Sequence, residues 1–128
     1  MNDSPKPLAR SATLRSPAPT ASAMFSFDLH AEIERLGSET AWQGGRTSKT
    51  LVKHPDFRVV LMLLKSSARL HEHTTAGSIS VQSLAGHIRM HVQDQVFDLP
   101  VGRLLTLERN LPHDVEAVED SAFLLTIA

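Results

Sequence analysis

The feature that most constrains this chain is a series of short strand-like runs, separated by turn residues, that begins near Thr47 and continues through residue 127. Each run alternates apolar and polar residues or is almost continuously apolar, and Gly, Pro, Asn or Asp stands at many of the junctions. The runs are residues 50–53, 57–64, 70–73, 79–85, 87–93, 95–99, 103–107, 112–118 and 122–127. Eight or nine strands in about 80 residues are typical of a small closed barrel, which leaves few exposed sheet edges. We therefore predict an all-β fold.

One short helix is predicted before the strands. Asp28 is a suitable N-cap, and Leu29, Ile33 and Leu36 fall on one face at i, i+4 and i+7. Gly37 stands where a left-handed residue ends a helix. The pattern predicts a helix over residues 29–36.

Residues 1–23 are rich in Ser, Pro, Ala and Thr and show neither helical nor alternating periodicity. They lack the apolar core of about 7–15 residues that a secretory signal needs, and their prolines interrupt any amphipathic targeting helix. We expect a disordered leader, a β-barrel domain over residues 24–128, and a cytoplasmic protein. Residues 38–46, with their Gly-Gly pair, are predicted to form a loop that crosses the surface.

The amino-acid composition excludes several classes of partner and of functional site. Thirteen basic and fourteen acidic residues give a net charge of -1, which argues against a nucleic-acid partner. No stretch approaches the roughly 20 apolar residues of a membrane-spanning helix, so we expect no membrane partner. Cysteine is absent, which excludes disulfides and thiolate sites. Any transition metal would have to use imidazole or carboxylate ligands, and seven histidines are present.

Alternate residues of a strand face the same side of the sheet, so the residues two positions away from a histidine indicate which side it faces. His113 shares its face with Val115 and Ala117, so we expect it to point into the core. His71 and His73 lie two residues apart on one strand and are expected to share a side, a common arrangement for chelating a metal. A lone His-x-His pair is also compatible with solvated or hydrogen-bonded histidines.

Other charged residues are assigned by the same alternation. Arg69 is expected on the side of His71 and His73, where it could bind a ligand carboxylate or be solvated at the barrel mouth. His87 and His91 are expected on the outer surface, opposite an apolar face.

The segment around His71 and His73 resembles the first motif of the cupin superfamily. That motif has a glycine, five residues, His-x-His, three or four residues, a glutamate, six residues and a glycine. His71, His73 and Gly86 fill three of the positions. Lys65 occupies the place of the first glycine, and Ile79 occupies the place of the glutamate.

The second cupin motif has a glycine, five residues, Pro-x-Gly, two residues, a histidine, three residues and an asparagine. Gly102 and His113 match it at the required separation. Asn110 replaces its inner glycine and can adopt the same left-handed backbone, whereas Ala117 replaces the final asparagine. The resemblance covers about residues 48–128 and implies a small single-domain cupin, an RmlC-like jelly-roll barrel of the conserved-barrel type.

The resemblance implies a divalent transition metal held by His71, His73 and His113 without the usual carboxylate. Three neutral imidazoles leave an open position and favour zinc, nickel or copper, with iron as a further candidate. The alternative is an empty or water-filled pocket lined by the same histidines.

Three functions remain open from the sequence. The first is a cupin that binds a small molecule in a histidine-lined pocket, and the second is a metal-dependent dioxygenase, isomerase or decarboxylase. The third is a regulatory module that senses a metal or ligand. The apolar runs 57–64 and 123–127 need cover on both faces, so we also predict a homodimer, with the helix over 29–36 as the competing cover.

Overall fold

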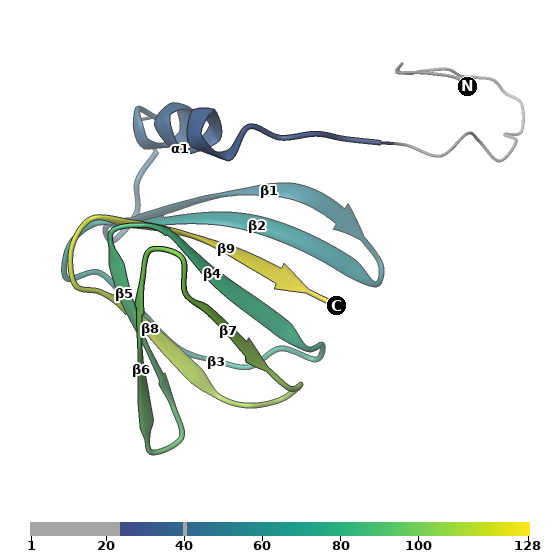
Figure 1. The fold of residues 1–128 in the computed structure, drawn as a ribbon, viewed down its shortest axis with the longest axis vertical. Helices are drawn as coiled ribbons and strands as arrows, with labels where there is room; N and C mark the ends of the chain where they lie inside the picture. The colour runs from purple at the N-terminus through teal and green to yellow at the C-terminus, as the bar shows by residue number, and fades with distance from the viewer. Residues whose placement is uncertain (1–23, 40) are drawn as a thin grey trace, which may run out of the picture.

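The computed structural model describes residues 24–39 and 41–128, and the predicted leader, residues 1–23, lies outside them. In the described part of the chain a helix, α1 (Leu29–Gly37), precedes nine strands (Figure 1). Asp28 caps α1 by accepting a 3.1 Å hydrogen bond from the backbone amide of Ala31, as the sequence indicated. Within these same residues, no helix has the length and apolar character to cross a membrane.

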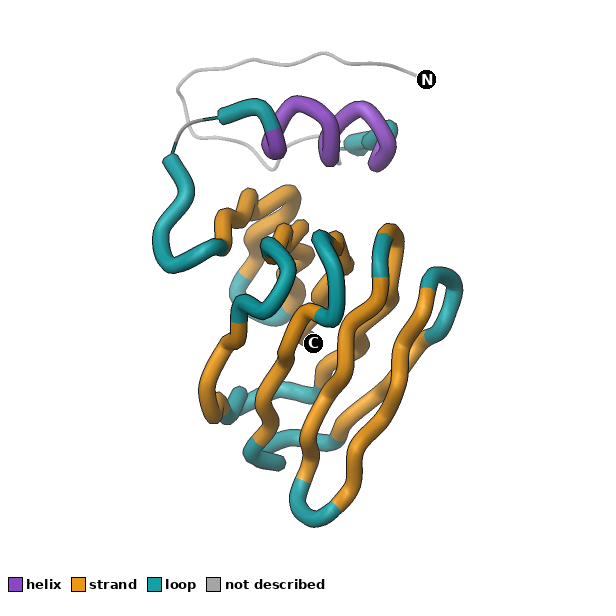
Figure 2. Tube along the Cα trace, turned by 90° about the vertical axis from the view of Figure 1, so that its left-hand side faces the viewer, coloured by secondary structure: helices purple, strands orange, loops and turns teal. Residues whose placement is uncertain are grey.

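The strands form two antiparallel sheets that face each other (Figure 2). The first sheet has the order β1-β2-β9-β4-β7 and the second the order β3-β8-β5-β6. Their bounds are β1 (Arg46–His54), β2 (Phe57–Leu64), β3 (Arg69–His73), β4 (Ile79–Ala85), β5 (His87–Val92), β6 (Gln95–Pro100), β7 (Leu104–Leu107), β8 (His113–Ala117) and β9 (Ser121–Ile127). The chain crosses between the sheets after β2, β3, β4, β6, β7 and β8, which gives a jelly-roll barrel. The predicted all-β fold with one short helix is confirmed.

The first strand starts earlier than the sequence predicted. Gly44 and Gly45 have φ values of 60° and 77°, a conformation that favours glycine and that a tight hairpin turn requires. On either side of this pair, Gln43 and Arg46 exchange backbone hydrogen bonds of 3.0 and 3.1 Å. The end of the predicted surface loop is therefore a rigid turn, and Arg46 is the first residue of β1.

The main core lies between the sheets. Leu64, Val81, Ile88, Met90 and Phe123 point into it, and each is at most 2% exposed. In β8 and β5 the burial alternates strictly along the strand, so one face of the second sheet is apolar and the other is polar. The barrel interior therefore accounts for one face of the apolar runs.

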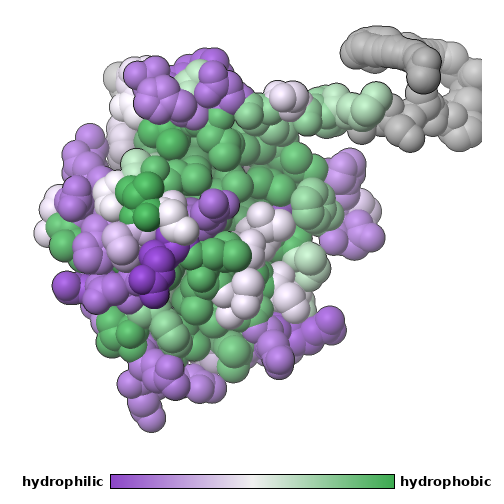
Figure 3. Space-filling model, in the orientation of Figure 1, coloured by the Kyte–Doolittle hydropathy of each residue, from purple (hydrophilic) through white to green (hydrophobic). Residues whose placement is uncertain are grey.

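A second cluster lies on the outside of the first sheet, beneath α1. Leu36 of the helix packs with Leu61, Leu63 and Ala122, and hydrophobic residues are visible below the helix over this sheet (Figure 3). The helix is also tied to β1 by an ion pair of 2.8 Å between Glu32 and Lys49. Thus α1 covers part of the second face, and the homodimer stays a prediction.

Candidate functional site

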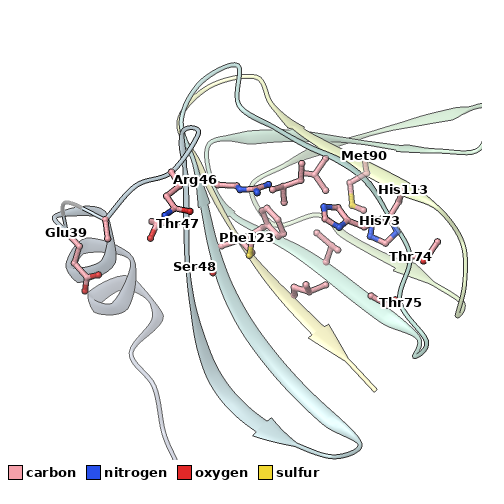
Figure 4. Close-up of a pocket in the computed structure, with 17 residues that line it drawn as sticks. Glu39, Arg46, Thr47, Ser48, His73, Thr74, Thr75, Met90, His113 and Phe123 are labelled. Atoms are coloured by element: carbon pink, nitrogen blue, oxygen red, sulfur yellow. The ribbon is translucent and has the colours of Figure 1, made fainter.

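A cavity of about 610 Å³ lies between the sheets, a size typical of small-molecule sites. Residues from β1, β2 and β9 line one side, and residues from β3 and β8 line the other (Figure 4). Its apolar lining consists of Met62, Leu70, Val81, Met90, Val115, Phe123 and Leu125. Its polar groups include the imidazoles of His73 and His113, the side chains of Glu39, Gln43 and Arg46, and several hydroxyls.

His113 is the most buried titratable side chain of the cavity wall, at 8% exposed. Its Nδ1 lies 2.9 Å from the backbone oxygen of Leu111. Because a carbonyl only accepts, Nδ1 must carry the proton, so the neutral ring has its lone pair on Nε2. No residue in the described ranges makes a hydrogen bond to that Nε2. His113 thus presents an acceptor to the cavity, and its predicted inward orientation agrees with the structure.

A β-bulge in β3 brings His73 beside His113. Leu70 pairs with Val115 and His73 pairs with His113, so three steps along β3 match two along β8. The extra residue places Leu70 and His73 on the same inner side, which strict alternation would not allow. The two imidazole centroids are 6.4 Å apart and tilted by 36° (Figure 4).

The same bulge leaves Arg69 and His71 outside the cavity wall. Arg69 donates hydrogen bonds of 2.7 and 3.3 Å to the carboxylate of Asp114, and Asp114 alternates with His113 on β8. The Arg69 guanidinium, and to a smaller extent nearby His71, lower the pKa of Asp114. The expectation that Arg69 and His71 share the side of His73 is therefore corrected, because alternation fails at the bulge.

The donor set does not fit the metal centre that the resemblance implies. Protein zinc sites use at least three protein ligands, and the cavity offers two imidazoles. Across residues 24–39 and 41–128, no three His, Cys, Asp or Glu side chains lie close enough together to hold one metal ion. Glu39 is a cavity-lining carboxylate, but it belongs to the segment between α1 and β1 and forms no such group with the histidines.

The charged and imidazole side chains of β5 and β6 form pairs on the outer face of the second sheet, and His87 and His91 lie on that face as predicted. His91 Nε2 lies 2.6 Å from Glu116, and its imidazole lowers the pKa of that carboxyl. Asp98 contacts Arg89 and His87, both at 2.9 Å, and these two side chains lower its pKa in that order.

Arg46 is one of the polar cavity residues that the sequence did not indicate. On β1 it pairs with Leu64, and Ser48 pairs with Met62, so both lie on the strand's inner face. The segment Arg-Thr-Ser-Lys-Thr has no apolar residue to show which side faces inward. The Gly-Gly turn before it was the available signal, since it marks the start of a strand.

Comparison with known proteins identifies the fold. No family model and no curated protein matches the sequence. An RmlC-like cupin protein from Desulfovibrio desulfuricans superposes with a TM-score of 0.66 at 24% identity, covering 83% of this chain and 97% of that one. An RmlC-like cupin from Shewanella frigidimarina gives 0.67 at 18% identity over 83% and 90% of the two chains. This chain has the cupin fold. A cupin 2 conserved barrel domain protein from Leptotrichia buccalis gives 0.65 at 27% identity over 72% of this chain and 45% of its own.

The residues that resemble the two cupin motifs differ in how far the structure brings them to the cavity. The turns of both are present, because Gly86, Gly102 and Asn110 have φ values of 74°, 92° and 65°. The histidine of the second motif lines the cavity. The His-x-His pair of the first motif is divided by the bulge, so the structure brings together two of the three predicted histidines.

Proposed function

We propose that this cupin binds a small organic molecule in the cavity between its sheets, in contact with His73 and His113. The observation that carries the proposal is the Nε2 atom of His113, a lone pair without a hydrogen-bond partner among the described residues on a side chain that is 8% exposed. His113 lines the cavity, so this lone pair is accessible to a molecule bound there. A hydroxyl or N–H group of a ligand can donate a hydrogen bond to it.

The apolar lining favours a ligand with a flat or branched hydrocarbon body. Met62, Met90 and Phe123 all contribute to it. Methionine sulfur and a phenylalanine ring both make favourable contacts with aromatic rings. A phenol combines such a body with a hydroxyl donor and is therefore a suitable probe.

The metal-dependent alternatives require a change in β3. A site with His71, His73 and His113 needs His71 on the inner side, and that would need the loss or shift of the bulge between Leu70 and His73. The metal site, a metal-dependent enzyme and a sensing module stay predictions, as does a cytoplasmic location. Binding of an organic molecule to two imidazoles and an apolar wall does not need a metal ion.

A titration with phenol, followed by amide chemical shifts of the cavity residues, tests the proposal. We expect saturable binding that His113→Ala weakens several-fold to about tenfold, the usual effect of losing one hydrogen bond. His71→Ala is the matched control, since this histidine does not line the cavity, and it should bind phenol like the original protein. Absence of saturable binding, or equal losses in the two variants, would contradict the proposal.

Elemental analysis after equilibration with zinc and desalting tests the metal alternative. The two-imidazole arrangement predicts less than one retained zinc ion per chain. One zinc per chain, lost in both His71→Ala and His113→Ala, would instead support the three-histidine site.

A further inference from the structure

Arg46 is held in place at the wall of the cavity by the turn that precedes it. The Gly44–Gly45 turn and the two backbone hydrogen bonds between Gln43 and Arg46 fix the start of β1. The amide of Lys65 also donates a 2.7 Å hydrogen bond to the carbonyl of Gly45, which ties this turn to the end of β2. The inner-face pairing of Arg46 with Leu64 then directs its side chain toward the cavity (Figure 4).

Arg46 is an exposed residue at the cavity wall, and it is the one arginine without an ion pair, among the described residues, that lines this cavity. Arg35, Arg69 and Arg89 each form an ion pair with a carboxylate. Among the described residues no carboxylate lies within ion-pair distance of Arg46, although Glu39 also lines the cavity. The cavity thus has an arginine whose five N–H donors are not used by a protein anion.

We propose that Arg46 binds the carboxylate of the cavity ligand, which is therefore a small organic monocarboxylate with an apolar body. A guanidinium matches a carboxylate through two parallel hydrogen bonds, and the aromatic and sulfur-containing side chains below it suit a hydrocarbon body. The proposal rests on the proposed function, because it names the ligand class of the same cavity. It adds a specificity-determining residue on the opposite sheet from the two imidazoles.

Benzoate and benzamide form a matched pair of probes, because they share size and ring and differ in charge. We expect the affinity for benzoate to be at least about tenfold higher than that for benzamide, because hydrogen bonds to a charged group are stronger than those to a neutral one. Arg46→Gln should remove this preference by weakening benzoate binding to the level of benzamide. Arg46→Lys should keep part of it, since the charge remains but the paired hydrogen bonds do not.

Arg103→Gln is the matched control, because Arg103 is exposed like Arg46 but does not line the cavity. It should leave the affinities for both probes unchanged, and all three variants should keep the thermal midpoint of the original protein. If phenol and benzamide bind in the cavity but benzoate binds no more tightly, or if Arg46→Gln leaves the preference intact, the carboxylate proposal is overturned and the proposed function stands. If none of the three probes binds, both are overturned.

Discussion

The two faces of the second sheet use polar side chains in opposite ways. On the outer face the carboxylates of β6 and β8 each have a cationic or imidazole partner, in the pairs Arg69–Asp114, His91–Glu116 and Arg89–Asp98. On the inner face His73 and His113 lie above an apolar wall, and His113 has an acceptor left over. The outer groups therefore satisfy one another, whereas the inner ones are free to bind something else.

In strand β8, successive residues lie on the inner and the outer face of the second sheet. Asp114 lies between His113 and Val115, yet it contacts Arg69 on the outside while its neighbours face the cavity. On β3 a single extra residue decides the side, since the bulge sends His71 outward and His73 inward. The number of imidazoles in the cavity thus depends on one local irregularity.

The largest expected difference between the two faces is in stability. Met90 on the inner face of β5 is fully buried, so Met90→Ala should lower the free energy of unfolding by about 2–5 kcal/mol. His91→Ala, the adjacent outer-face position, should have a much smaller effect because it removes a partly exposed pair. Chemical denaturation of both variants measures the difference. Similar losses would break the distinction between the faces.

The outer faces of the two sheets also differ in their suitability as a surface for homodimer formation. That of the first sheet is apolar and α1 covers part of it, whereas the outer face of the second sheet is charged. The predicted homodimer should therefore form through the first sheet, and Leu124→Lys, a half-buried position on β9, should shift it toward monomer. Analytical ultracentrifugation measures this shift. Val96→Lys, an exposed apolar position on the outer face of the second sheet, is the matched control for an added charge and should leave association unchanged. A monomeric parent protein would contradict the dimer.

The smallest expected effect is an acid-dependent loss of stability from the outer face. The pKa values of Asp98, Asp114 and Glu116 are lowered by their partners, so folding favours the charged forms. Their contribution is present above the ordinary values of 3.8 for Asp and 4.5 for Glu, and it is lost as the pH falls through the lower folded pKa values.

Thermal midpoints at several pH values check this prediction. A variant with Asp98→Asn, Asp114→Asn and Glu116→Gln should be less stable than the parent protein near pH 7 and should approach it at strongly acidic pH. A constant difference at every pH would show that the carboxylate charges are not responsible.

The sequence predicts the fold better than the site, for physical reasons. Strong contrast between neighbouring residues, as between His113, Asp114 and Val115, gives the correct face directly. In β3 the residues Arg-Leu-His-Glu-His contain one apolar side chain, so no pattern reveals where alternation breaks. The start of β1 has no apolar residue at all, which is why Arg46 was not predicted in the cavity. Bulges and polar strand ends are set by pairing with distant strands, which local periodicity does not record.

The bulge in β3 separates His71 from His73. Nuclear Overhauser effects between assigned imidazole protons test this separation most directly. The structure predicts contacts between the rings of His73 and His113, whose centroids are 6.4 Å apart, and none between the rings of His71 and His113. Contacts from His71 to both other rings would contradict the account and would restore a three-histidine centre.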